Sequence, residues 1–377
     1  MAEQHKTFAI YVITKHGLKI ARRIRECIPG ADLFVSTRFA EQAPSDAIAM
    51  SLPMGSTLKA AWPQYDCHIH IISVGAVVRM IKDLLVDKKT DPAVVCVDDA
   101  ARYSICVLSG HVGRGNEFTE RIATAIDAMP VVTTASDSIG TLTVDILGRD
   151  LGWQLDDMER NVTLACAEVV NGNNTCFVQE TGEPDFWPLN KPLPRGVNYA
   201  TCLSEVDPNE FTMLLICSDR RFEASHPIHW QKSVIYRPKS LVLGLGCDRD
   251  TSLDVVEDGV LKFLEEQKLS VKSVRNIASI DKKSDERALI ELAEKYRWSF
   301  DVYPAEQLDV VEGIENPSET VKKYVGTRSV AEAACLLSSG ANRLLMPKQP
   351  FRKTEDGRNM TCAIARIPFD HRAEVGR

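Results

Sequence analysis

Short apolar runs alternate with segments of helical periodicity along most of the chain. Residues 8–13 and 67–72 form apolar runs of strand length, and helical patterns follow them at 18–27 and 76–85. Runs such as 94–97 are apolar on both faces, which is typical of strands covered on both sides by helices. The alternation predicts βαβ units and therefore an α/β fold with mostly parallel sheets.

The alternation stops in the middle of the chain. Residues 171–239 are dense in Pro, Gly and Asn and contain only short apolar pieces. From 241–245 onward, strand and helix patterns alternate again. We therefore expect two βαβ-type domains, at 1–140 and 240–370, joined by a smaller irregular or β-rich middle region at 141–239.

Composition narrows the classes of partner. The chain has 377 residues, of which 44% are hydrophobic and 26% charged, and its formal net charge is −7. Nucleic acid is not expected as a partner, because its binding needs a concentrated basic face. A local cluster of Arg and Lys would still suffice to bind a small anion.

The apolar runs also bear on location. None reaches the roughly 18 residues of a membrane span, and the N-terminus lacks the apolar stretch of a signal peptide. The eleven cysteines form no C-x-x-C pair, and many lie in apolar runs, as Cys96 and Cys106 do. That pattern is typical of reduced, buried thiols. We expect a cytoplasmic protein without membrane contact.

The first candidate segment is a glycine turn at 73–76 with a charged loop downstream at 87–92. Glycine between a strand and a helix lets the backbone approach a ligand, and the helix start presents free N–H groups. Two lysines beside a proline-fixed turn suit a ligand that bears carboxylates. The alternative is a plain turn followed by a solvated loop. The candidate substrate-binding residues here are Ser73, Gly75, Arg79, Lys88, Lys89 and Asp91.

The second segment, 109–116, mixes glycines with polar side chains. Its free N–H groups would stabilise an oxyanion, and His111 would move protons near neutral pH. The structural alternatives are a surface histidine and a helix N-cap at Asn116. Ser109 with His111 suggests a serine hydrolase, but the G-x-S-x-G elbow is absent and residues two apart seldom face each other. Two glycines are added as binding candidates, Gly110 and Gly113.

Other segments carry weaker indications. Thr133 and Thr134 follow a strand and either donate to an anion or are ordinary turn residues. The 244–252 loop lacks the third glycine of a dinucleotide fingerprint, because Arg249 stands there. His68 and His70 share one face of a strand, but no third metal ligand at suitable spacing accompanies them. We therefore expect neither a nucleotide nor a protein-bound metal.

Together the segments resemble the cobalt-precorrin-5A hydrolase family. Two stretches resemble its N-terminal region: SVGAVVRMIKDLLVDKKTDPAVVCVDDAARYSICVLSGHVGRGNEFTERIA (73–123) and PVVTTASD (130–137). Four resemble its C-terminal domain: LVLGLGC (241–247), IASIDKKSDERALIELAE (277–294), VGTRSVAEAA (325–334) and TCAIAR (361–366). The middle region matches only in position.

The chain departs from the family's usual text at several positions. Arg114 stands where a glycine is usual, and Asp99 stands where a glutamate is usual. Asp248 and Asp250 replace a basic residue and a glycine. Two acids in the 244–252 loop argue against a simple anion-binding role for it.

The resemblance implies a hydrolase of anaerobic cobalamin (vitamin B12) biosynthesis. Such an enzyme opens the δ-lactone of cobalt-precorrin-5A with water, releases acetaldehyde and gives cobalt-precorrin-5B. It implies that His111 acts as general acid or base, with Ser109 in the same catalytic loop. The proposed binding set is Ser73, Gly75, Arg79, Lys88, Lys89, Asp91, Gly110, Gly113, Asn116, Thr133 and Thr134.

The resemblance also sets expectations about cofactors and partners. The cobalt arrives with the tetrapyrrole substrate, so the protein itself needs no cofactor. A non-catalytic carrier of a corrinoid intermediate is the alternative function. Transient contact with neighbouring pathway enzymes and a homodimer are both compatible with the sequence.

Overall fold

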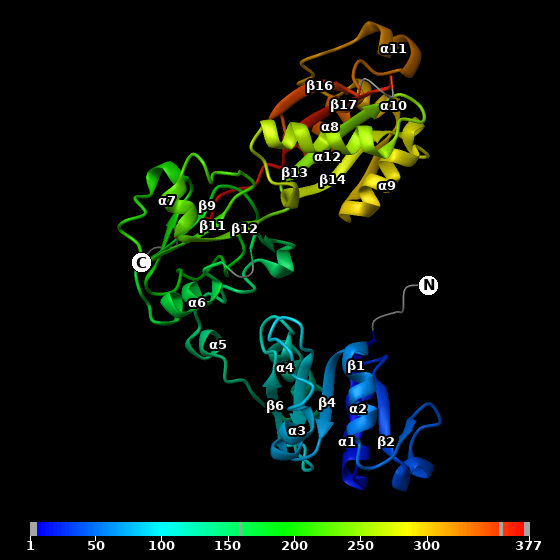
Figure 1. Cartoon of the computed structure of the whole chain (residues 1–377), viewed down its shortest axis with the longest axis vertical. Helices are drawn as coiled ribbons and strands as arrows, with labels where there is room; N and C mark the ends of the chain where they lie inside the picture. The colour runs from blue at the N-terminus through cyan, green and yellow to red at the C-terminus, as the bar shows by residue number, and fades with distance from the viewer. Residues whose placement is uncertain (1–5, 158–159, 354–356, 373–377) are drawn as a thin grey trace. The chain divides into compact units, whose positions relative to one another are not determined.

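The computed structural model describes residues 6–157, 160–353 and 357–372 (Figure 1). The chain divides into two compact units, Met1–Ile146 and Leu147–Arg377. No described helix is long and apolar enough to cross a membrane.

The first unit is built on a seven-stranded sheet in the order β3-β2-β1-β4-β5-β6-β7. Every neighbouring pair is parallel except β5 and β6, which are antiparallel. The strands are β1 Lys6–Val12, β2 Asp32–Ser36, β3 Ile48–Met50, β4 Tyr65–Ile71, β5 Ala93–Val97, β6 Tyr103–Leu108 and β7 Met129–Val131.

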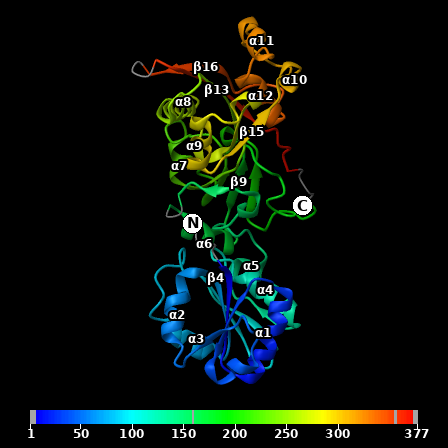
Figure 2. The ribbon, with the colours of Figure 1, turned by 90° about the vertical axis from the view of Figure 1, so that its right-hand side faces the viewer.

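Helices cover both faces of this sheet (Figure 2). The helices are α1 Lys15–Cys27, α2 Gly55–Ala61, α3 Val74–Ile81, α4 Gly115–Ile126 and the short α5 Ala135–Ile139. Successive residues of β1 point to opposite sides, so that Ile10 packs with α1 and α4 while Tyr11 packs with α2 and α3. A strand buried on both faces explains why the apolar runs are continuous.

The second unit contains two five-stranded sheets. The sheet of the middle region has the order β10-β9-β11-β12-β8, and only β8 pairs antiparallel. Its elements are β8 Gln154–Leu155, α6 Val162–Val170, β9 Thr175–Gln179, β10 Val197–Ala200, β11 Met213–Cys217, α7 Pro227–Gln231 and β12 Ser233–Arg237. The region expected to be irregular or β-rich therefore carries a mostly parallel sheet, and the dense Pro and Gly belong to the connection between β9 and β10.

The other sheet has the order β15-β14-β13-β17-β16. Helices α8 and α9 pack on one face and α12 on the other. The elements are β13 Leu241–Cys247, α8 Leu253–Glu266, β14 Val274–Ile280, α9 Arg287–Tyr296, β15 Ser299–Tyr303, α10 Ala305–Asp309, α11 Glu319–Val325, α12 Ala331–Ser339, β16 Met346–Arg352 and β17 Asn359–Arg366. The predicted α/β class with mostly parallel sheets is confirmed.

Glycine at position 244 permits close packing of α12 on β13. A Cβ atom placed on Gly244 would lie 1.8 Å from the main-chain oxygen of Ala331. The small-residue start of α12 and the first glycine of the 244–252 loop therefore have one shared role, which is the approach of helix to strand.

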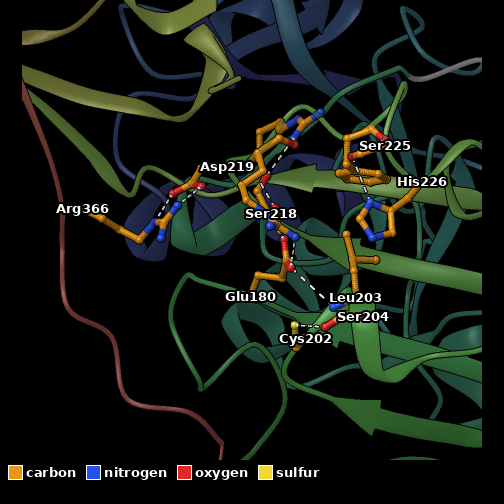
Figure 3. A network of polar contacts seen from close by, with 12 residues as sticks. Glu180, Cys202, Leu203, Ser204, Ser218, Asp219, Ser225, His226 and Arg366 are labelled. Atoms are coloured by element: carbon orange, nitrogen blue, oxygen red, sulfur yellow. Dashed lines mark hydrogen bonds and ion pairs between the residues drawn. The ribbon is translucent and has the colours of Figure 1, made fainter. Parts of the chain in front are cut away.

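A buried carboxylate joins the two sheets of the second unit. Asp219 follows β11 and accepts hydrogen bonds from Arg366 Nε at 2.6 Å and Nη2 at 2.7 Å (Figure 3). Ser240 Oγ also donates to Asp219, at 2.8 Å. Beside it, Ser218 Oγ donates to Glu180 at 2.6 Å. With these donors satisfied, Asp219 is 1% exposed and needs no further ligand.

Candidate active site

The antiparallel strand β6 decides which loops meet. Leu108, at the end of β6, pairs with Val94 at the start of β5. The glycine loop 109–116 therefore lies at the edge of the sheet where β4 and β5 begin. Strand β7 runs parallel to β6, so the segment 132–137 emerges at the same edge. The topology brings two of the predicted segments together.

The same topology separates the glycine turn at 73–76 from them. Ile71 ends β4 beside Val97, at the opposite edge. His68 is level with Val94, so about five residues of extended chain, roughly 16 Å, lie between the two levels. The prediction that Ser73 and Gly75 line a pocket with loop 109–116 is therefore wrong. Arg79 is also at that far edge, where its Nη1 donates to the main-chain oxygen of Gly75 at 2.9 Å.

His111 lies between two carboxylates. Its Nδ1 is 3.2 Å from Asp145 Oδ1, and its Nε2 is 3.1 Å from Asp137 Oδ2. Ser136 Oγ also lies 3.1 Å from Nε2. The imidazole is 18% exposed, whereas Asp137 is 41% exposed. A histidine with an acid on each ring nitrogen is held in one orientation, and both of its N–H groups find acceptors when it is protonated.

These acids set the charge of His111. The hydrogen bond to Asp145 is the largest influence and raises the pKa of His111 above its ordinary value, with Asp137 adding to the effect and partial burial opposing it. Opposite charges favour the protonated imidazole. Near neutral pH the group is therefore biased toward the imidazolium, which is a proton donor.

Asn116 and Thr134 complete this cluster. Asn116 Nδ2 donates to Thr134 Oγ1 at 2.7 Å and also to Asp137, and Thr134 Oγ1 donates to Asp137 Oδ2 at 2.6 Å. Asn116 is buried, and its Oδ1 has no hydrogen-bond partner among the described residues. Two predicted binding residues thus lie in the first contact layer around Asp137, while Thr133 beside them is exposed.

Ser109 has a different role from the predicted catalytic one. Its Oγ donates to the main-chain oxygen of Asp91 at 2.9 Å, and its φ is 55°. Gly113 packs against it so closely that a Cβ there would lie 2.5 Å from Ser109 Cβ. Gly110 packs similarly on the Asn116 amide. The serine and these two glycines shape the loop, and no contact joins Ser109 to His111 among the described residues.

The charged loop before β5 lies at the same edge as loop 109–116. Asp91 is 8% exposed, and both of its carboxylate oxygens accept from the Val86 N–H at 3.1 Å, so it holds the loop together. Lys88 is exposed, whereas Lys89 is partly buried and lines a cavity.

That cavity has a volume of about 750 Å³. Lys89 and Asp91 contribute to it from one side, and Val112–Arg114 of the glycine loop contribute from the other. Its walls carry aromatic rings, and Arg121 of α4 adds a cation. The aromatic lining residues are Trp62, Tyr65 and Phe118. Apolar walls with a few charged groups are typical of a site for an organic anion.

Several of these residues were not predicted. Asp137 and Asp145 contact His111 from 26 and 34 positions away, and no local pattern links them to it. Arg121 lies on a regular amphipathic helix whose sequence resembles any surface helix. Asp137 alone carried an indication, because it closes the hydroxyl-rich segment at 133–138.

His68 and His70 belong to the core. His68 Nδ1 lies 2.9 Å from Tyr11 Oη and its Nε2 lies 3.2 Å from the main-chain oxygen of Trp62. His70 is fully buried against the Tyr11 ring, with 4.7 Å between ring centroids. Both rings therefore pack as apolar groups in a stack of aromatic side chains.

Three family models match the chain in order. They are described as Cobalamin synthesis G N-terminal, Cobalamin biosynthesis central region and Cobalamin synthesis G C-terminus, and they match residues 56–137, 142–238 and 241–365. Cobalt-precorrin-5A hydrolase of Priestia megaterium is 38% identical over 97% of this chain and 96% of its own length. The chain belongs to the cobalt-precorrin-5A hydrolase family. The cobalt-precorrin-5A hydrolase of Salmonella typhimurium is 30% identical over 89% of this chain and 93% of its own.

Among solved structures, a cobalamin biosynthesis protein G homolog from Sulfolobus solfataricus covers 97% of this chain and 99% of its own at 19% identity, with a TM-score of 0.37. Within the family segments, His111, Asn116 and Asp137 fall in the N-terminal one, whereas Asp145 falls in the central one. The histidine and its two carboxylates thus come from both segments.

Proposed function

We propose that this chain hydrolyses cobalt-precorrin-5A, opening its δ-lactone and releasing acetaldehyde to give cobalt-precorrin-5B in anaerobic cobalamin biosynthesis. The observation that carries the proposal is the 38% identity to a cobalt-precorrin-5A hydrolase over 97% of the chain. A histidine held between two carboxylates supports it, because lactone opening and fragmentation both need a proton carrier.

The chemistry divides into two proton transfers at His111. Water adds to the lactone carbonyl carbon, the ring C–O bond breaks, and the imidazolium gives its proton to the departing alkoxide oxygen. The new hydroxyl then returns a proton to the neutral imidazole as the C–C bond breaks, the electron pair stays on the macrocycle, and the aldehyde leaves. His111 ends in its starting state, and Asp145 and Asp137 stabilise its charged form.

The cavity beside the glycine loop is our candidate for the macrocycle's binding site. Val112–Arg114 line the cavity while the neighbouring His111 contacts the two acids, so one loop serves both binding and chemistry. Lys89 and Arg121 provide cations for peripheral carboxylates, and the aromatic walls provide an apolar surface. The cobalt is carried by the substrate, so the proposal requires no cofactor of the protein, and its place of action is the cytoplasm.

Anaerobic incubation with cobalt-precorrin-5A tests the function. Acetaldehyde is measured by the oxidation of NADH in a coupled alcohol dehydrogenase assay, with a heat-denatured sample as control. We expect aldehyde in step with loss of the lactone. Tight binding of the intermediate with no aldehyde would refute hydrolysis and favour the carrier function.

A further inference from the structure

The second unit contains a separate cavity that the proposed chemistry does not use. It has a volume of about 480 Å³ and lies at the carboxyl ends of β13 and β14. Strand β13 contributes Cys247 and the residues just after it, β14 contributes Ile280 and the lysines that follow, and α11 and the start of α12 close the side. All of these elements belong to one compact unit.

The topology makes this edge a ligand-binding position. The chain leaves β13 through α8 to β14 and β15 on one side, and it returns through α12 to β16 and β17 on the other. Helices α8 and α9 cover one face and α12 the opposite face. In open α/β sheets, ligands bind outside the carboxyl ends of the strands where the connections diverge in this way.

The cations around the cavity are of two kinds. Arg249 and Lys283 are neutralised by Glu286, with Lys283 Nζ 2.8 Å from its Oε2. Lys282 and Lys348 instead donate to main-chain oxygens, at 3.1 and 2.9 Å. Neither is in an ion pair with any residue that the structure describes. Each ammonium has three donors, so a single carbonyl leaves donors for an anion.

The rest of the lining is apolar. Val321 and Val325 come from α11, and Val330 comes from the start of α12. The 244–252 loop adds no anion site of its own, because Asp248 accepts from the Asn359 N–H at 2.8 Å and so holds the loop against β17. The cavity therefore combines two cations lacking acid partners with a valine wall. Such a lining fits an amphipathic molecule with carboxylates on an apolar frame.

We propose that this cavity is a second binding site for a carboxylate-bearing tetrapyrrole, whose acidic side chains are engaged by Lys282 and Lys348. The choice of a tetrapyrrole rests on the proposed function, whereas the cations and the apolar wall are observed independently of it. The site holds an edge of the macrocycle, because its volume is smaller than that of the cavity in the first unit.

Titration of the full-length chain with uroporphyrin III tests the proposal. This stable, carboxylate-rich porphyrin is followed by its fluorescence. We expect the double variant Lys282→Ala/Lys348→Ala to bind it at least about tenfold more weakly, since each variant side chain removes a charge-assisted contact. Lys262→Ala, on α8 and outside the cavity lining, is the matched control and should bind as the unchanged chain does.

Lysine acetylation followed by mass spectrometry locates the bound porphyrin. Porphyrin should protect Lys282 and Lys348 but leave Lys262 as reactive as before. No protection of the pair, or porphyrin binding that is lost in Arg121→Ala and unchanged in the double variant, would overturn the second site.

The two proposals fail separately. His111→Ala should lose hydrolysis and still bind uroporphyrin through Lys282 and Lys348. A chain that releases acetaldehyde without lysine-dependent porphyrin binding overturns the second site and leaves the hydrolase function. A chain that binds porphyrin through the two lysines but releases no acetaldehyde supports the site and overturns the function.

Discussion

His111 is the residue on which the proposed chemistry depends. Replacing it with alanine removes the proton carrier and should slow acetaldehyde release at least tenfold, which corresponds to ~1.4 kcal/mol of barrier. His16→Ala is a suitable control, because His16 is an exposed histidine of the same unit. Near-normal acetaldehyde release by His111→Ala would remove this residue from the mechanism.

Asp145 tunes His111 without needing to touch substrate. Its hydrogen bond is the largest cause of the raised pKa of His111, so Asp145→Asn should lower that pKa. Because the first step needs the protonated imidazole, activity should then be lost at a lower pH as pH rises. The measurement is the pH profile of kcat for both proteins. An unchanged alkaline limb would show that Asp145 has no influence on the reacting proton.

His70 links stability to pH. Burial lowers the pKa of His70 from 6.5 to about 3, so the folded state keeps it neutral while the unfolded chain becomes protonated. The stability of the first unit should therefore fall as pH decreases from about 6.5 toward 3, by up to about 1.4 kcal/mol per pH unit for one such group.

The variant His70→Phe separates this effect from general acid denaturation. Phenylalanine keeps the stacking with Tyr11 and cannot be protonated, so urea unfolding should depend less steeply on pH in this window. His16→Phe, at an exposed position, serves as the comparison. Equal pH dependence in the unchanged chain and in His70→Phe would contradict the assignment.

At the scale of elements, the contact between β13 and α12 leaves no room for a side chain. Gly244→Ala would place its Cβ 1.8 Å from a backbone atom of Ala331, and backbone cannot swing aside as a flexible side chain can. We expect a loss of about 1–3 kcal/mol in the free energy of unfolding, measured with urea. Gly55→Ala is the control, since nothing lies within 4 Å of a Cβ there. Equal stability of the two variants would show that α12 shifts at little cost.

The element pattern was predictable from the sequence, but the direction of one strand was missed. Apolar runs and helical periodicity located most strands and helices, because buried parallel strands are apolar on both faces. Only five residues, 98–102, connect β5 to β6, which is too short for a parallel crossover and fits an antiparallel turn. That length was visible in the sequence, and it moves loop 109–116 to the opposite edge from Ser73.

The middle region was misjudged for a related reason. Its Pro-rich and Gly-rich stretch lies between β9 and β10, while the strands on either side are short and buried. Composition averaged over the whole segment therefore suggested irregular structure. Short strands flanked by long connections give weak periodicity even when they form a regular sheet.

At the scale of the whole molecule, the candidate site is only partly local. The sequence pointed to His111, Asn116 and Thr134 separately, because glycine-rich and hydroxyl-rich loops after strands are locally recognisable. Asp145 has no such context, and only the fold carries it to the imidazole. Ser109 looked catalytic by residue type, yet its backbone conformation directs the hydroxyl to a main-chain oxygen.

Charge balance makes a last prediction about substrate affinity. The chain's net charge is −7, so its overall field repels a polycarboxylate and binding must rest on local cations. Arg121 lines the cavity of the first unit with its guanidinium 5.4 Å from the Phe8 ring centroid. Arg121→Ala should therefore raise KM about tenfold, since a hydrogen bond to a charged group contributes roughly 1.5–3 kcal/mol. Because this contact holds the substrate in ground state and transition state alike, kcat should stay unchanged.

The control for this variant is Arg102→Ala. Arg102 is exposed, interacts with Asp98 at the opposite edge of the sheet and does not line the cavity. Its removal changes the net charge by the same amount, so it isolates the local contact from the overall field. If both variants raise KM equally, the long-range field governs affinity and the cavity loses its claim to the substrate. If Arg121→Ala lowers kcat instead, Arg121 acts on the transition state, and the macrocycle lies closer to the chemistry than the loop arrangement implies.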